Sequence, residues 1–82
     1  MIYQLVFKPR AVRDLRDIRS SDRARLLSHI EKLSDDLRGD VKRLTNFTPE
    51  FRLRVGSYRV LFEIDRDRVI IYRVVHRKDA YR

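Results

Sequence analysis

Residues 51–64 combine three arginines with a regular spacing of apolar side chains. Arg52 and Arg54 alternate with apolar residues before a turn at Gly56, and Arg59 follows the turn. Because successive side chains of a strand point to opposite faces, this spacing predicts a β-hairpin with one apolar face and one arginine face. Guanidinium groups bind phosphate or carboxylate through paired hydrogen bonds. The arginine face is therefore expected to bind an anionic group.

Cleavage of RNA is one reaction that can run without a metal ion, and arginines on a rigid sheet can stabilise the charge that develops in it. The 2′-hydroxyl attacks the adjacent phosphorus and the 5′-oxygen leaves, so the protein must stabilise negative charge and help to move protons. Arginine stabilises charge but is a poor base. The titratable candidates are His76, Lys78 and Tyr81. From the residues alone, Tyr81 can also stack on a base or be an ordinary terminal aromatic, and His76 can be a strand-end histidine without a catalytic role.

Other kinds of active site find little support in the sequence. Gly39 and Gly56 are the only glycines, so a glycine-rich phosphate loop is not expected. The His, Asp and Glu residues show no metal-ligand spacing, and no serine lies in a nucleophile-elbow motif. We therefore expect neither a metal ion nor an organic cofactor.

The chain of 82 residues carries a formal net charge of +8, and 16 of its 20 basic residues are arginine. This excess favours a polyanionic partner, either nucleic acid or an acidic protein segment, while part of the charge serves only to solvate helices. The length predicts a single domain over residues 1–82. The sequence has no cysteine, no apolar stretch long enough to cross a bilayer and no signal-peptide pattern, which together predict a cytoplasmic protein without a membrane partner.

The first half of the chain is expected to form a strand and two helices. Residues 2–7 are mostly apolar and predict an opening strand, after which Pro9 suits the first turn of a helix. Residues 20–22 are good helix N-caps, and the apolar stripe that follows runs to Leu37, with Gly39 placed for a left-handed cap. Because so few residues join the two helices, an antiparallel helical hairpin is expected.

The second half is expected to form a connector and then strands. Residues 40–50 are predicted to be a connector whose Lys42 and Arg43 extend the arginine face, while its apolar side chains at positions 41, 44 and 47 anchor it to the core. Residues 68–75 form the last predicted strand, with Val69, Ile71, Arg73 and Val75 on one face. The predicted fold class is α+β: an N-terminal strand, a two-helix antiparallel hairpin and a three-stranded antiparallel meander, with the helices packed on one face of a small sheet.

The hairpin at residues 51–64, followed by residues 74–81, resembles the RelE/ParE toxin superfamily of bacterial and archaeal toxin–antitoxin modules. The opening strand, the Ala-Val-Arg-Asp-Leu helix and the approach to the hairpin at residues 42–44 match this superfamily as well. The resemblance implies a RelE-like fold and one of two targets. The RelE branch cleaves mRNA in the ribosomal A site, whereas the ParE branch poisons DNA gyrase. The ending at residues 76–82 is more similar to the RelE branch.

The same resemblance implies roles for individual residues. Arg59 and Arg77 match the phosphate-stabilising arginines, and Tyr81 matches the tyrosine that stacks on or orients the substrate base. Arg52 and Arg54 stand where the best-known members have lysines, one of them a proposed base, and some relatives use histidines for proton transfer. The expected catalytic residues are Arg54, Arg59, His76, Arg77 and Tyr81, and the expected substrate-binding residues are Lys42, Arg43, Arg52 and Lys78.

The sequence therefore predicts the toxin of a toxin–antitoxin module, acting as a metal-free, ribosome-dependent endoribonuclease that stops translation. Two alternatives remain open: a ParE-like toxin that inhibits DNA gyrase without catalysis, and a non-toxic module that binds only antitoxin and operator. The resemblance implies a cognate antitoxin protein, mRNA and the ribosome as partners, with operator DNA bound only through the antitoxin complex. A net charge of +8 suits an antitoxin segment that carries acidic groups.

Overall fold

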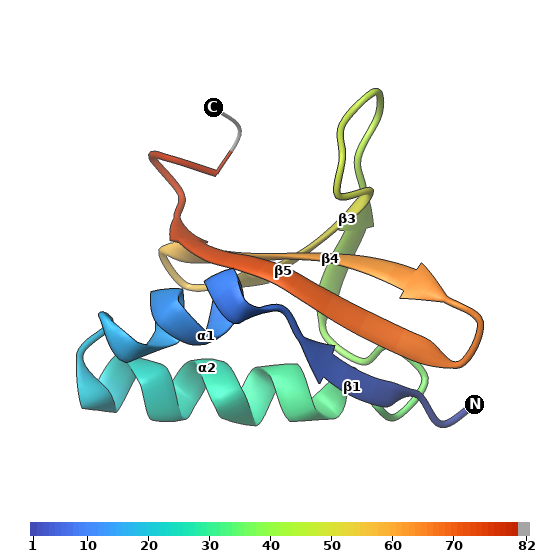
Figure 1. The fold of residues 1–82 in the computed structure, drawn as a ribbon, viewed down its shortest axis with the longest axis horizontal. Helices are drawn as coiled ribbons and strands as arrows, with labels where there is room; N and C mark the ends of the chain where they lie inside the picture. Colours follow the sequence, from blue (N-terminus) through green and yellow to red (C-terminus); the bar gives the residue numbers. More distant parts are fainter. Residues whose placement is uncertain (81–82) are drawn as a thin grey trace.

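The computed structural model describes residues 1–80 as five strands and two helices (Figure 1). In chain order these are β1 (Gln4–Phe7), α1 (Pro9–Arg16), α2 (Ser20–Lys32), β2 (Asp40–Arg43), β3 (Phe51–Val55), β4 (Tyr58–Asp65) and β5 (Arg68–His76). The strands form one sheet in the order β1-β5-β4-β3-β2, in which β1 is parallel to β5 and every other pair is antiparallel. The predicted α+β class and the three-stranded meander β3-β4-β5 are confirmed.

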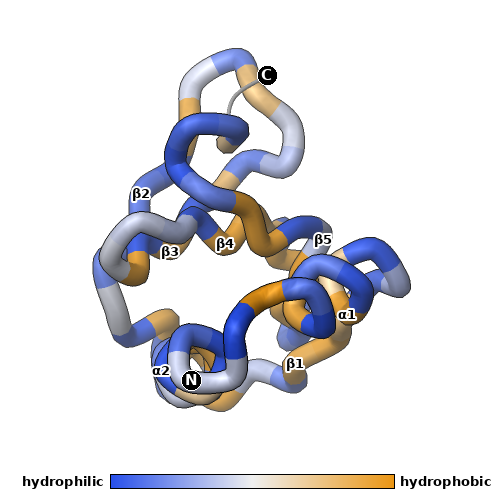
Figure 2. Tube along the Cα trace, turned by 90° about the vertical axis from the view of Figure 1, so that its left-hand side faces the viewer, coloured by the Kyte–Doolittle hydropathy of each residue, from blue (hydrophilic) through white to orange (hydrophobic). Residues whose placement is uncertain are grey.

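The two faces of the sheet are covered differently. Both helices lie on one side, with α2 running back along α1, as the predicted helical hairpin requires (Figure 1). The loop between β2 and β3 and the tail after β5 rise from the opposite side, and an end-on view shows the same division (Figure 2). We call the two sides the helix face and the open face.

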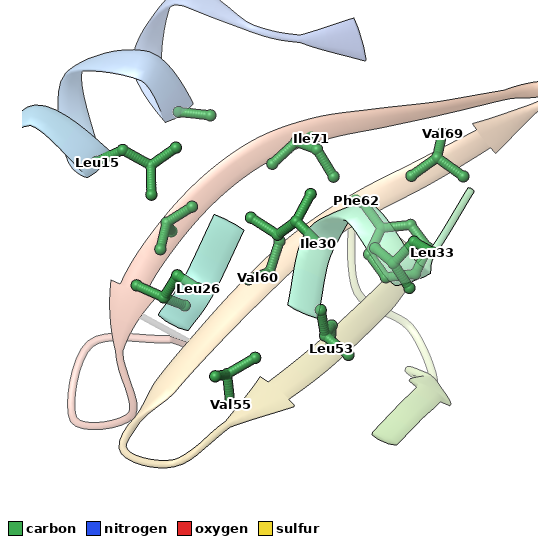
Figure 3. Packing of buried hydrophobic residues seen from close by; sticks show 12 residues of the cluster. Leu15, Leu26, Ile30, Leu33, Leu53, Val55, Val60, Phe62, Val69 and Ile71 are labelled. Carbon is green, nitrogen blue, oxygen red and sulfur yellow. The ribbon is translucent and has the colours of Figure 1, made fainter. Parts of the chain in front are cut away.

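The helix face of the sheet carries the hydrophobic core. Side chains of Leu53, Val60 and Phe62 project from β3 and β4 toward Leu26 and Ile30 of α2, and all are almost completely buried (Figure 3). Full burial of such a side chain stabilises the fold by about 1.5–3 kcal/mol. This layer is therefore the main source of stability for so short a chain.

The arginine hairpin forms as the sequence predicts. Arg54 of β3 lies directly opposite Arg59 of β4, and a two-residue turn joins the strands. Gly56 in this turn has a φ of 57°, a left-handed conformation that glycine adopts without steric cost. Apart from Leu61, the apolar side chains of the hairpin face the helices, so its arginines lie on the open face.

The connector over residues 40–50 is shorter than predicted, because its first four residues form β2. This edge strand pairs with β3 and places Asp40 opposite Arg54 and Lys42 opposite Arg52. Its helix face offers only Val41 to the core. Because β2 alternates poorly between apolar and polar residues, its sequence does not stand out as a strand.

The predicted face assignment in the last strand is wrong in its second half. Phe62 of β4 pairs with Ile71 and Leu61 pairs with Arg73, so Tyr72 is an extra residue in β5. Such a β-bulge reverses the alternation beyond it. Val74 consequently joins Ile71 in the core and is almost fully buried. His76, two residues further on, therefore projects from the helix face.

The second helix begins where the sequence predicts, at Ser20, but its predicted end is wrong. The helix ends at Lys32 rather than near Gly39, because Asp36 and Leu37 adopt left-handed conformations with φ of 57° and 59°. Its N-cap is Arg19, and no side chain makes a capping hydrogen bond there, so residues 20–22 lie inside the helix. Leu37 still packs against the core from its position in the loop.

Polar side chains fasten the first helix to its neighbours. Arg23 donates through Nη1 to the carbonyl groups of Leu15 and Ile18 at the end of α1, at 3.2 Å in each case. Asp14 of α1 accepts the backbone N–H of Val74 at 2.9 Å and pairs with Nε of Arg73 at 2.8 Å. The pairing of β1 with β5 ends at Ile71, so Asp14 satisfies the edge of β5 that β1 does not reach.

Neither helix within residues 1–80 is long and apolar enough to cross a membrane.

Candidate functional site

A hollow of about 430 Å³ lies on the open face, between β2, β3, β4 and the loop after β2. We call it the arginine hollow. Four basic side chains line it together with a threonine and two apolar residues: Lys42, Leu44, Thr45, Phe47, Arg52, Arg54 and Arg59. The structure thus brings together four of the nine residues expected to act on a substrate, all of them cationic.

Asp40 holds two of these arginines in place. Nε of Arg54 lies 2.6 Å from Oδ2 of Asp40, and Nη1 of Arg52 lies 3.2 Å from Oδ1 and 2.8 Å from the backbone oxygen of Asp40. The hydrogen bonds and charges of Arg52 and Arg54 lower the pKa of the Asp40 carboxyl group below its ordinary value. Asp40 therefore stays ionised near neutral pH and fixes both guanidinium groups beside the hollow.

Arg59 is held separately, by the hairpin turn. Its Nη1 donates to the carbonyl oxygens of Gly56 at 3.0 Å and Tyr58 at 2.9 Å, and the side chain is half-buried. These bonds use one nitrogen of the guanidinium group and leave its other nitrogens available to a ligand. Arg59 thus reaches the arginine hollow from the strand opposite Arg54.

The hollow has one apolar wall. Leu44 and Phe47 line it from the loop after β2, although the sequence led us to expect that they pack against the core. Phe47 also lines a smaller hollow over Leu61, where the loop meets the tail at Ala80. Cations beside an aromatic side chain suit a nucleotide, since the phosphate binds guanidinium groups and a base can stack on a ring.

Three other predicted residues lie outside the arginine hollow. Arg43 pairs with Glu50, with 3.1 Å between Nη2 and Oε2. It lies opposite Phe51 of β3, on the face of the sheet that does not carry the arginines. Arg77 and Lys78 follow the end of β5 and have exposed side chains. Tyr81, the ninth predicted residue, lies outside the described residues.

His76 lies at a different hollow, on the helix face. This second cavity, of about 360 Å³, is formed where the start of α2 meets the β3–β4 turn, and we call it the end hollow. Its lining residues are Arg19, Asp22, Arg25, Leu26, Val55, Ser57, Tyr58 and His76. The His76 ring stands edge-on to the Tyr58 ring, with 5.8 Å between the ring centroids. The structure therefore does not bring His76 together with the arginines of the open face.

Sequence reasoning missed Asp40 and Thr45. Asp40 could have been found from its register opposite Arg54, but only once residues 40–43 are known to be a strand. Thr45 carries no signal beyond its place in a loop next to basic residues. Within residues 1–80 no group of three or more His, Asp or Glu side chains is placed to hold a metal ion.

Residues 5–81 match the family model described as the ParE toxin of the type II toxin–antitoxin system parDE. Toxin RelE3 of Methanocaldococcus jannaschii is 32% identical over 83 residues, covering 95% of this chain and 94% of that protein. Two solved toxin–antitoxin complexes contain similar chains. The RelBE2 complex of Mycobacterium tuberculosis aligns with a TM-score of 0.80 at 30% identity, covering 93% of this chain and 99% of the other.

The RelB–RelE complex of Methanococcus jannaschii aligns with a TM-score of 0.74 at 31% identity, covering 89% of this chain and 91% of the other. The family model and these relatives are all toxins, and the matches span nearly the whole chain. The resemblance seen in the arginine hairpin is thereby confirmed. The chain belongs to the ParE family of toxins within the RelE/ParE superfamily, and is a RelE-like toxin of a type II toxin–antitoxin system.

Proposed function

We propose that this toxin is an endoribonuclease that cleaves mRNA in the A site of the ribosome, with the arginine hollow as its active site. The observation that carries the proposal is the convergence of Lys42, Arg52, Arg54 and Arg59 beside Phe47 on one open surface. A polyanion fits such a surface, and an aromatic wall next to it suits a base. The names of the relatives support the RelE branch.

In this proposal the hollow acts by stabilising charge. The 2′-oxygen attacks phosphorus as it loses its proton, the bond from phosphorus to the 5′-oxygen breaks and that oxygen takes up a proton. Negative charge develops on the phosphate oxygens, and the free N–H groups of Arg54 and Arg59 bind those oxygens most strongly in the transition state. Lys42 is the one described lining residue that can take up and release a proton, since arginine remains protonated. Arg77 and Tyr81 act from the tail, Arg77 on the phosphate and Tyr81 on the base. We assign His76 no step at the phosphate, because its ring lines the end hollow.

A cognate antitoxin is the second part of the proposal. The similar solved chains were crystallised as complexes with antitoxins, and a chain of net charge +8 attracts an acidic partner segment. We propose that such a protein holds this toxin inactive, and that operator DNA is bound only through the pair. The free toxin acts where its ribosomal target is, in the cytoplasm.

Single-turnover cleavage on programmed ribosomes tests the catalytic part. Arg59→Ala should slow the chemical step by about a hundred- to a thousandfold, the typical effect of losing one charged donor to a developing anion. Arg77→Ala should have an effect of the same order. Arg13→Ala is the matched control, because this exposed arginine lies on α1 and lines neither hollow, and it should cleave at the wild-type rate.

Wild-type rates in both Arg59→Ala and Arg77→Ala would show that the active face lies elsewhere. A different result, growth arrest with intact mRNA, would favour the ParE-like alternative. The match to the ParE family model is the observation that favours this alternative. Inhibition of DNA supercoiling by purified gyrase decides between the two. Harmless over-expression of the folded chain alone would instead indicate a module that has lost toxicity.

A further inference from the structure

We propose that the end hollow binds a second phosphate of the RNA strand that is cut in the arginine hollow. The inference rests on the proposed function and adds a substrate subsite on the opposite face of the sheet. The residues that line the end hollow are rich in hydrogen-bond donors, and the hollow lies across the β3–β4 turn from the arginine hollow.

Arg25 is the first of these donors. It is exposed and lines the end hollow, and its guanidinium group makes no hydrogen bond or ion pair with any other described residue. Its guanidinium group nevertheless has a defined place, because it lies over the hairpin turn: a Cβ atom added to Gly56 would stand 3.2 Å from Nη1 of Arg25. A guanidinium group at the wall of a hollow, with all its donors unused, is suited to an oxyanion.

His76 is the second donor, and its tautomer follows from a backbone contact. The N–H of Lys78 donates to Nδ1 of His76 at 3.3 Å. In the neutral ring the proton is then on Nε2, which leaves Nε2–H to donate to a ligand. The Tyr58 ring beside it fixes the orientation of the imidazole. His76 therefore contributes a hydrogen bond to a bound anion rather than accepting one.

The charge of the end hollow is positive. Asp22 is the sole acid among its described lining residues, and it is partly compensated by Arg19, whose Nη2 lies 3.6 Å from Oδ2 of Asp22. Among residues 1–80, Arg25 and the imidazole N–H have no anionic partner. Arg77 and Lys78 extend the basic character just beyond His76 along the chain. A ligand carrying negative charge and several acceptor oxygens fits this set.

Position explains why the ligand is a phosphate of the same strand rather than an isolated carboxylate. The β3–β4 turn separates the two hollows: Arg59 donates to the carbonyl of Gly56 on the side of the arginine hollow, while Arg25 lies over Gly56 on the side of the end hollow. A chain that passes over this turn meets cations on both sides. Repeated negative charges along one flexible chain are a property of single-stranded RNA.

Binding of uncleavable oligonucleotides tests the inference. We would measure fluorescence anisotropy with single-stranded RNA carrying 2′-deoxy substitutions, at lengths from about 4 to 16 nucleotides, the range of single-strand sites. Arg25→Ala should lower the affinity for the longer oligonucleotides by about tenfold at low salt. It should also reduce the slope of log affinity against log salt concentration by about 0.7, the value for one phosphate of a single strand. The shortest should lose nothing, because they fill only the arginine hollow.

Two matched variants complete the design. Arg25→Lys keeps the charge and should keep the salt slope, whereas Arg13→Ala removes an exposed arginine from α1 and should change neither length class. Equal losses at every length in Arg25→Ala would overturn the subsite. So would an Arg25→Ala protein that binds RNA normally but loses affinity for its purified antitoxin, since the hollow would then belong to that partner. The proposed function is judged independently, by whether the wild-type protein cleaves mRNA on ribosomes.

Discussion

The two faces of the sheet are built from the same strands but differ in the burial and the charge of their side chains. Leu53, Val60 and Phe62 are completely buried against the helices, while Arg52, Arg54 and Arg59 alternate with them and border an open hollow. One face buries apolar area, and the other gathers a cluster of positive charge around the carboxylate of Asp40. The alternation of side chains along a strand makes both possible within two adjacent strands.

Stability and chemistry are therefore separable in this small domain by a single step along the strand. A substitution in the buried core of the helix face should act on folding, whereas one in the arginine hollow should act on rate or binding. Like charges gathered on the open face repel one another, so the core on the helix face and the carboxylate of Asp40 must offset that cost. Substitutions at Phe62, Gly39 and Asp40, two of them with a milder or matched control, probe this division in decreasing order of expected effect.

Phe62→Ala should have the largest effect, because it removes a fully buried ring from the centre of the helix face. Phe62 is inaccessible to solvent and stacks on Phe51 with 5.5 Å between ring centroids. Truncation of a buried aromatic side chain typically costs about 3–5 kcal/mol. Small domains have only about 5–15 kcal/mol of stability in total, so urea denaturation followed by circular dichroism should show a large loss or an unfolded chain.

Phe62→Leu gives a milder test of the same point. It should retain the fold and cleave normally once folded, because Phe62 does not line the arginine hollow. A folded Phe62→Leu protein with a greatly reduced chemical rate would show that the faces are coupled more tightly than the alternation suggests.

Gly39→Ala should have an intermediate effect. Gly39 lies between the core residue Leu53, which it contacts, and Asp40, which follows it in the chain and faces the open side. Gly39 has a φ of 133°, and an added Cβ would stand 2.7 Å from Cδ1 of Leu53, which is fully buried and cannot move outward. Strain and overpacking together should cost about 2–3 kcal/mol, measurable as a lower thermal midpoint. The residue after Gly39 is Asp40, so some loss of activity should accompany the loss of stability.

Gly56→Ala is the matched control for Gly39→Ala. It also places a side chain at positive φ, but the nearest atoms belong to the exposed guanidinium group of Arg25 rather than to the buried core. The cost should be about 1–2 kcal/mol from the backbone conformation alone. If the two alanine variants lose equal stability, the contact with Leu53 is unimportant.

Sequence reasoning succeeded where the pattern was local and regular. The hairpin was predictable because residues 51–55 alternate strictly and Gly56 marks the turn. It failed at β2, where Asp40 and Lys42 are charged for the same reason as Arg52: they face the open side. A strand with charges on one face and a single apolar residue on the other has no clear periodicity.

The site was harder to predict, because it depends on contacts between strands. The bulge at Tyr72 carries no signal in residue type, yet it decides that His76 faces the helices and not the arginines. The left-handed conformations of Asp36 and Leu37, which keep the chain after Lys32 from continuing as a helix, were similarly unpredictable, because neither residue is a glycine. The role of Asp40 depends on the register of β2, a long-range property that composition and spacing do not encode.

Asp40→Asn should have the smallest effect and tests whether order on the open face matters as well as charge. The substitution keeps the size of the side chain but removes the anion that pairs with Arg52 and Arg54. Both guanidinium groups should become less well positioned, and a misplaced catalytic group slows the chemical step, here by about tenfold. Affinity for the ribosome should hold or rise, because the net positive charge increases by one. Single-turnover rates at saturating ribosomes separate the two effects.

The pH dependence of stability gives an independent readout for Asp40. Its folded-state pKa is lowered, first by the hydrogen bond from Arg52 and then by Arg54, so the ion pairs stabilise the folded protein above the unfolded pKa of about 4. This contribution is lost as the pH falls through the lower, folded pKa. The wild-type protein should therefore be more stable than Asp40→Asn at pH 7, and the difference should vanish in strong acid and shrink in high salt, since the pair is exposed. If the two proteins have the same urea midpoint at pH 7 but Asp40→Asn cleaves more slowly, Asp40 contributes position alone, and the division between the faces is sharper still.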